Sequence, residues 1–273
     1  MGVKEALFRF LGQMRLVWRY KDFIKSTIVR DFQARYRNSV LGIAWTILNP
    51  LAMILIYTVI FSQVMQSRLP NSQSPFAYSI FLMSGLLPWG LFSDLVARGP
   101  YLFLEQANLL KKMQLPKLSF LIILLCNAII NFLIIETLFV VFLLWAGQFP
   151  GWPILALIPL LILQLWFSAA LLLILALLNV FFRDIVPITN IALQFGFWLT
   201  PIVYAASMIP PRFQVFLHLN PLANLFEAYH TIFVGHDWPD WSSLWSVALC
   251  TLLLTGLAYH LFQTRSSEMV DQL

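Results

Sequence analysis

The chain has 273 residues, of which 60% are hydrophobic and 11% are charged, and its formal net charge is +5. A water-soluble domain carries about 25% charged residues, so the composition excludes that class of protein. Because a transmembrane helix needs roughly 20 mostly apolar residues, this length allows about six spans, and we expect an all-α polytopic membrane protein.

Residues 1–40 are expected to form a cytoplasmic tail that ends in an amphipathic interface helix. In the tract DFIKSTIVRDFQARYR, apolar side chains recur every four residues at Ile24, Ile28, Phe32 and Tyr36 and share one helix face. The other faces carry the bases Lys25, Arg30, Arg35 and Arg37. Such a helix lies at the membrane surface, where its bases meet either anionic lipid or the anionic head group of a substrate. The forked donors of arginine suit phosphate.

Six apolar runs are long enough to cross the hydrocarbon core, and they define a six-helix transmembrane domain over residues 41–273. The runs are Leu41–Gln63, Phe76–Ser93, Leu118–Trp145, Pro153–Phe182, Pro187–Ala205 and Ser243–Gln263. All but two of the 17 Lys and Arg residues fall on one side of this arrangement, the exceptions being Arg68 and Arg212. The positive-inside rule therefore predicts a multi-pass protein of the cytoplasmic (inner) membrane with both termini in the cytoplasm.

A seventh apolar run, Val215–Val234, differs from the other six. It contains His218, Glu227 and His230 and is broken by Asn220-Pro221. Irregular or polar backbone at membrane depth is tolerated only inside protein or beside water. We therefore expect a re-entrant outer hairpin here, before the last span.

The loop between the second and third runs is more ordered than a simple basic loop requires. Asn108–Gln114 is expected to form a short helix that Pro116 stops. An apolar stripe of Leu109, Leu110 and Met113 lies beside the bases Lys111, Lys112 and Lys117. A stripe of this kind in the cytosol favours a protein partner, and a helix lying flat on the membrane is the alternative.

A second cytoplasmic loop, NVFFRDI, is very short and places Arg183 directly beside Asp184. Adjacent residues on a helix do not face each other, so we expect two separate contacts, with a partner or with other loops, in place of a mutual ion pair. By contrast, Asp94 and Arg98 are four residues apart at the end of the second run, and this spacing predicts a local pair.

The third run carries polar residues at membrane depth. Asn127 and Asn131 are four residues apart and share a helix face, and Glu136 follows them. An ionisable residue inside the membrane is a functional candidate by default. The alternative is a protonated Glu136 that is hydrogen-bonded to a neighbouring helix.

The sequence contains no recognisable enzyme motif. It lacks a phosphate loop, a nucleophile elbow, an H-E-x-x-H pattern and any Cys/His cluster at metal-ligand spacing. Cys126 and Cys250 lie in long apolar runs, as is typical of small buried hydrophobes. His236 and Asp237 lie in a turn-rich outer loop, where solvated polar residues are more usual than an acid–base pair. The chain thus shows no energy source of its own.

The motifs also occur in a recognisable order. RYRNSVLGIAWTILNPL enters the first run and is followed by GLLPWGLF, ANLLKKMQLPK, NVFFRDI, FWLTPIVY and LNPLANLFEAYH. This ordered set resembles the permease subunit of ABC transporters of the polysaccharide-export type. The pattern N-L-L-K-K-x-x-x-P resembles especially the O-antigen and teichoic-acid branch.

The resemblance implies a homodimer that pairs with two copies of a separate ATP-binding subunit and exports a lipid-linked polysaccharide. ATP and Mg²⁺ would bind to that partner, so this chain would be a transport subunit with no catalytic or metal-binding residue, and no nucleic acid would be a partner. A drug or simple-lipid exporter of the same architecture is one alternative. Another is a membrane-embedded glycan or acyl transferase, for which the scattered Glu136, His236 and Asp237 supply no catalytic cluster.

The resemblance also implies roles for particular residues. Coupling to the ATPase falls to Asn108, Leu109, Leu110, Lys111, Lys112, Met113, Gln114 and Pro116, with a smaller contact at Arg183 and Asp184. The exit gate falls in the segment 210–234, at Pro210, Pro211, Asn220, Pro221 and Glu227. The arginines at 30, 35 and 37 lie where a substrate head group would enter.

Overall fold

The computed structural model of the chain describes residues 18–36, 41–60, 76–112, 115–210, 220–266 and 268–272, with Arg212, Gln214 and Leu217 between them. Every regular element in these residues is helical. Four helices are long and apolar enough to cross a membrane. They are α4 (Ala77–Arg98), α6 (Lys117–Trp145), α7 (Leu157–Phe181) and α11 (Trp245–Arg265). The expected all-α polytopic class is confirmed at this level, and α6 starts and ends within one residue of the predicted third run.

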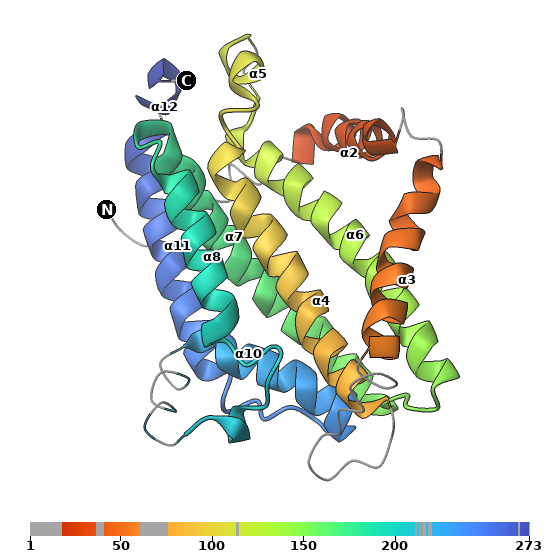
Figure 1. Cartoon of the computed structure of the whole chain (residues 1–273). Coiled ribbons are helices and arrows are strands. Elements are labelled where there is room, and N and C mark those ends of the chain that lie inside the picture. Colours follow the sequence, from red (N-terminus) through yellow and green to blue (C-terminus); the bar gives the residue numbers. More distant parts are fainter. Residues whose placement is uncertain are drawn as a thin grey trace.

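Two shorter apolar helices run beside the four long ones, α3 (Trp45–Thr58) and α8 (Ile185–Leu199) (Figure 1). At 1.5 Å per residue they are about 21 and 22 Å long, which is less than the hydrocarbon thickness of about 30 Å. The prediction that the fifth run continues as helix to Ala205 is wrong. Thr200 precedes Pro201 and is extended, with φ −105° and ψ 134°, because a residue before proline is pushed out of the helical region.

Short helices lie at the two ends of the bundle (Figure 1). At one end, α2 (Lys21–Tyr36) lies across the bundle and contacts α6, and α5 (Ala107–Lys112) and α12 (Glu268–Gln272) project nearby. At the opposite end, α10 (Pro221–His230) contacts α4 and α7. Single turns complete the described structure: Gly42–Ala44, Gly99–Tyr101, Trp152–Ala156, Ala206–Met208 and the π turn Thr231–Gly235.

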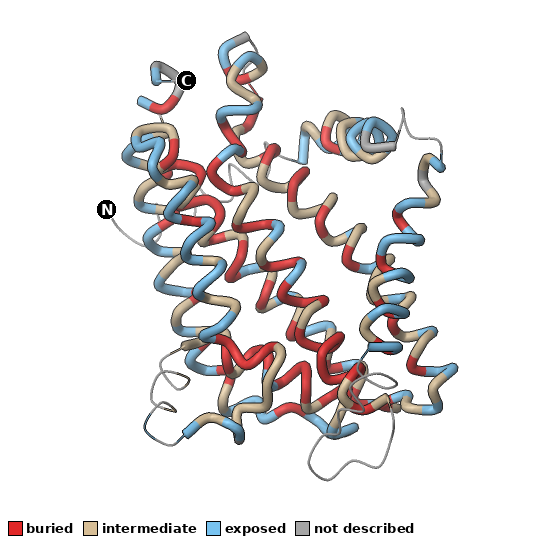
Figure 2. Tube along the Cα trace, in the orientation of Figure 1, coloured by how far each residue is buried: buried red, intermediate tan, exposed pale blue. Residues whose placement is uncertain are grey.

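The core lies around α4, which is buried over most of its length (Figure 2). The turn after α4 packs directly on α7, since a Cβ added at Gly99 would lie 3.2 Å from Leu172 Cα. Asn179 Nδ2 secures the same contact by donating to Pro100 O at 2.8 Å. Helices α4 and α7 therefore form the centre against which the other helices pack.

Polar side chains hold α10 to this centre. Gln164 of α7 donates through Nε2 to Pro88 O of α4 at 2.7 Å, and its Oε1 accepts from the Tyr229 hydroxyl of α10 at 2.7 Å. All three residues are buried. A buried amide that uses both its donor and its acceptor in this way stabilises one particular arrangement of three helices.

A second set of contacts centres on His230, at the end of α10. Its Nε2 lies 3.0 Å from Pro201 O and its Nδ1 lies 2.9 Å from Ser84 Oγ. A carbonyl oxygen only accepts, so Nε2 carries a proton and donates to Pro201 O. The Ser84 hydroxyl also donates to Phe81 O at 2.8 Å, and the imidazole stacks on Phe81 with ring centroids 4.0 Å apart.

The close approach of α4 to the segment after α8 depends on Gly85. A Cβ at this position would lie 2.7 Å from Ile202 O and 3.0 Å from His230 Cε1. We expect Gly85→Ala to cost about 1–3 kcal/mol through overpacking and to lower the melting temperature of the detergent-solubilised protein by several degrees.

Gly90→Ala is the matched control in the same helix, because a Cβ there meets nothing within 4 Å. Thermal unfolding of both variants, followed by circular dichroism, checks the prediction. Equal melting temperatures for the two variants would contradict the close packing at Gly85.

Candidate functional site

The predicted coupling segment forms α5, which is shorter than expected. Asn108 and Lys111 are exposed, but Leu110 is only 8% exposed and packs in the core of this chain. The chain itself therefore supplies packing partners for Leu110, and the contact of the stripe with a partner protein stays a prediction. Leu109 is half-buried. Pro116 ends the loop as the extended residue that caps α6.

The side chain of Lys112, and the residues Met113 and Gln114, lie outside the described part of the chain. Nearby, the C-terminal segment supports α5. The short helix α12 contacts both α5 and α7, and its Met269 is fully buried. Lys117 Nζ donates to Ser266 O and so connects the start of α6 with the end of α11.

Arg183 and Asp184 form the turn between α7 and α8, at the same end of the bundle as α5 (Figure 1). Both side chains are exposed. Within the described residues they form no ion pair with each other. Two exposed segments, α5 and this turn, thus lie on one end of the bundle where a partner could contact both.

Helix α2 presents its predicted apolar face to protein. Ile24 is 8% exposed and packs with Ile28 in the core against which α6 also packs. Asn127 Nδ2 of α6 donates to Asp31 Oδ2 of α2 at 3.3 Å. Arg30 is exposed and, with Arg98, lines a cavity of about 100 Å³ between α2, α6 and the segment after α4. The Arg35 side chain and Arg37 lie outside the described part.

The polar residues of α6 have separate surroundings, although Asn127 and Asn131 share a face. Asn127 contacts α2, whereas Asn131 lines a larger cavity. Glu136 Oε1 is buried and has no hydrogen-bond partner among the residues that the structure describes, and the phenol of Tyr229 lies within its electrostatic reach.

The predicted pair of Asp94 and Arg98 is confirmed, with 3.5 Å between Oδ2 and Nη1 and both side chains partly exposed.

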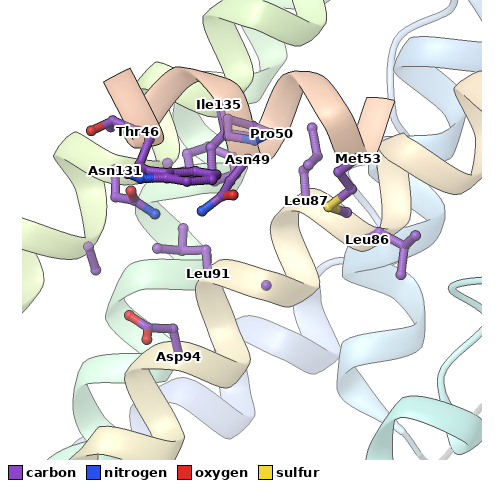
Figure 3. A pocket seen from close by; sticks show the side chains of 14 residues that line it. Thr46, Asn49, Pro50, Met53, Leu86, Leu87, Leu91, Asp94, Asn131 and Ile135 are labelled. Carbon is purple, nitrogen blue, oxygen red and sulfur yellow. The ribbon is translucent and has the colours of Figure 1, made fainter. Parts of the chain in front are cut away.

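The larger cavity has a volume of about 650 Å³ and lies between α3, α4 and α6 (Figure 3). The amides of Asn49 and Asn131 and the carboxylate of Asp94 lie toward one end of it, and Met53 and Leu86 lie toward the other. The full lining is Trp45, Thr46, Asn49, Pro50, Met53, Leu86, Leu87, Gly90, Leu91, Asp94, Ala128, Asn131, Phe132 and Ile135.

Helix α8 carries two polar residues that sequence reasoning missed. Asn190 and Gln194 are one turn apart and exposed, in a helix of which only Thr189 is buried. Neither amide has a hydrogen-bond partner among the described residues. Their spacing is the same as that of Asn127 and Asn131, so the same signal was present in the sequence. An amide within an apolar helix needs protein or water beside it.

The predicted break at Asn220-Pro221 is confirmed as the start of α10. Asn220 Oδ1 accepts from Leu222 N at 3.0 Å and caps the helix, and Pro221 occupies the first turn, where its missing N–H costs nothing. Asn220 Nδ2 also donates to Thr200 Oγ1 at 2.9 Å, directly after α8. Glu227 and Pro210 are exposed, and Pro211 lies outside the described residues.

The burial of Leu110 and the exposure of Lys111 lead to a prediction about α5. Leu110→Asp places a carboxylate among apolar side chains, so we expect it to cost several kcal/mol and to lower the melting temperature of the purified chain. Lys111→Asp should leave that temperature nearly unchanged, because exposed substitutions shift stability by about 0.5 kcal/mol or less. A similar melting temperature for the two variants would show that α5 does not pack as described.

Comparison with known proteins assigns the chain to a family. Over 262 residues it is 32% identical to the O-antigen export system permease protein RfbA of Myxococcus xanthus, which covers 95% of this chain and 98% of that protein. It is 33% identical to the O-antigen export system permease protein RfbA of Klebsiella pneumoniae, and the match covers 76% of this chain and 78% of that protein. It is 24% identical to the polysialic acid transport protein KpsM of Escherichia coli, and that match covers 92% of this chain and 96% of that protein. The model of the ABC-2 type transporter family matches residues 23–234, and the chain belongs to this family.

Proposed function

We propose that this chain is the permease subunit of an ATP-driven exporter that moves a lipid-linked, O-antigen-like or teichoic-acid-like polysaccharide across the cytoplasmic membrane. The observation that carries the proposal is the nearly end-to-end similarity to an O-antigen export permease. The more distant relative is also named as the transporter of a glycan polymer. A polymer as substrate therefore fits the relatives better than a drug or a simple lipid.

In this proposal α3 and α8 complete a set of six spans with α4, α6, α7 and α11. Their orientation along the bundle supports this, since the chain crosses from the α2 end to the α10 end and back three times (Figure 1). The segment around α10 is then a re-entrant hairpin at the outer face. The end of the bundle that carries α2 and α12 then faces the cytoplasm, in agreement with the distribution of basic residues.

The exposed amides of Asn190 and Gln194 support a path along α8. Inside hydrocarbon these groups would be left without partners, at a cost of a few kcal/mol. A second copy of the chain, facing α8 across a water-filled passage, supplies both protein and water at that depth. We propose that a homodimer forms the translocation path in this way, with α8 from each copy along its wall.

Energy enters from two ATP-binding subunits, on which ATP and Mg²⁺ bind. The exposed side chains of Asn108 and Lys111, together with the turn at Arg183 and Asp184, form the proposed contact with these subunits. Motion at α5 can pass inward because α5 contacts α12, and α12 contacts α7. Leu110 serves this contact indirectly by holding α5 to the bundle.

The substrate enters beside α2 and leaves beside α10. Arg30 lies on α2, at the end of the bundle that faces the cytoplasm in this proposal, and Arg35 and Arg37 follow it in the sequence. A lipid-linked glycan carries its phosphates at that face, and guanidinium groups bind phosphate through paired donors. At the outer end, Asn220, Pro221 and Glu227 form part of the proposed exit gate. Glu136, which lies in electrostatic reach of Tyr229 on α10, is proposed to influence the same gate.

Loss of the chain should trap the glycan on its lipid carrier at the cytoplasmic face. We expect a strain with the gene deleted to accumulate lipid-linked glycan, measured by extraction and mass spectrometry, and the wild-type gene to restore export. Lys111→Asp should fail to restore export while leaving the melting temperature intact, because it reverses a charge at the ATPase contact. Asp22→Asn is the control for a charge change elsewhere on the cytoplasmic side. Normal glycan export in the deletion strain would overturn the proposed substrate class.

The six-span topology predicts which positions are accessible from outside. In a protein that carries Cys126→Ala and Cys250→Ala, a membrane-impermeant maleimide applied to spheroplasts should label Asp237→Cys and leave Lys111→Cys unlabelled. Permeabilised cells should show labelling at both positions. Labelling of Lys111→Cys in intact spheroplasts would contradict the orientation.

A further inference from the structure

The cavity between α3, α4 and α6 lies within the part of the bundle that crosses the membrane. Helix α3 packs mainly on α6 and makes few contacts with α4. Side chains do not fill the space between α3 and α4, and the cavity lies there. Its volume of about 650 Å³ is within the range of about 300–1,000 Å³ that is typical of sites for small organic molecules. In a bilayer, an apolar cavity of this size beside the lipid is open to lipid chains.

The chemistry of the lining changes along the cavity. Its inner part is apolar, with Met53 of α3, Leu87 of α4 and Ile135 of α6. Toward the end where α4 approaches Arg98, the cavity meets Asn131 and then the Asp94 carboxylate (Figure 3). The polar groups therefore lie on the side of α2, and the apolar groups lie deeper in the bundle. A phospholipid of the leaflet next to α2 has the same order, with its head group outside and its acyl chain inside.

The charges select among head groups. Asp94 is anionic, and its contact with Arg98 is long, at 3.5 Å, so the carboxylate can accept from a second donor. Arg98 lies one turn further along α4 and lines the smaller cavity beside α2, so it is not part of this lining. A head group that carries a primary ammonium can donate to Asp94, whereas a purely anionic head group would place its charge beside this carboxylate.

We propose that this cavity is a lipid-binding site for one phospholipid with a primary-amine head group, such as phosphatidylethanolamine, with an acyl chain against Met53 and Leu87 and the ammonium at Asp94. The bound chain completes the packing of α3 on α4. The proposal goes beyond polysaccharide export and does not depend on which substrate is carried, so the two can fail separately.

The first measurement locates the lipid in the unaltered protein. The full-length chain is placed in nanodiscs that contain phosphatidylethanolamine with a photoreactive diazirine in its acyl chain, and the labelled peptides are identified by mass spectrometry. We expect label on the α3 and α4 peptides that carry Met53 and Leu87, above the level on the exposed face of α11. Label spread evenly over all lipid-facing helices, or label absent from the α3 and α4 peptides, would overturn the site.

The second measurement tests the cavity with matched variants. Gly90 lines the cavity and a Cβ there meets nothing within 4 Å, so Gly90→Leu should fill the space without a collision in the protein. Gly256→Leu is the control, since Gly256 is equally open but lies on α11. Native mass spectrometry after detergent exchange should show phosphatidylethanolamine retained by the wild type and by Gly256→Leu but lost from Gly90→Leu. Equal retention by both variants would overturn the proposal.

The head-group preference is tested by Asp94→Asn. The wild type should retain phosphatidylethanolamine about two- to fivefold better than phosphatidylglycerol, as expected for one partly exposed ion pair. Asp94→Asn should still retain lipid but lose this preference, whereas the control Asp22→Asn should keep it. A preference that is unchanged in Asp94→Asn would overturn the role of the carboxylate.

Discussion

The side-chain amide of Gln164 is the contact on which the arrangement of the helices at the α10 end of the bundle depends. Helix association in a membrane has little hydrophobic driving force, because lipid is as apolar as the helix surfaces, so packing and polar contacts decide which arrangement forms. Gln164 reaches Pro88 O on one side and the Tyr229 hydroxyl on the other, and so joins α4, α7 and α10. His230 adds a contact from α10 to Ser84 and to the segment after α8.

Features that depend on local sequence were predictable. The bounds of α6 follow from a continuous apolar run, the start of α10 follows from Asn220-Pro221, and the pair of Asp94 and Arg98 follows from their spacing. The end of α8 was not recovered. The apolar pattern continues past Leu199, but Pro201 ends α8 there, and hydropathy alone does not register the conformational restriction of the residue before proline.

Features that depend on which helices become neighbours were not predictable from one sequence. The apolar stripe of α5 was recognised, but the burial of Leu110 depends on α5 folding back on its own chain. Gln164 and Tyr229 are polar residues within apolar runs, which is visible in the sequence. Their mutual hydrogen bond is not, because it joins residues 65 positions apart. Similarly, Asn127 and Asn131 share a face, and only the placement of α2 and α3 separates their surroundings.

The two hydrogen bonds of the Asn220 side chain limit how the α10 end of the bundle can move. One oxygen and one nitrogen of the same side chain hold the first turn of α10 and the residue that follows α8. A displacement of the segment after α8 relative to the start of α10 would therefore break one of these two bonds or be shared by both segments. The Asn220 side chain in this way couples the C-terminal end of α8 to the first turn of α10.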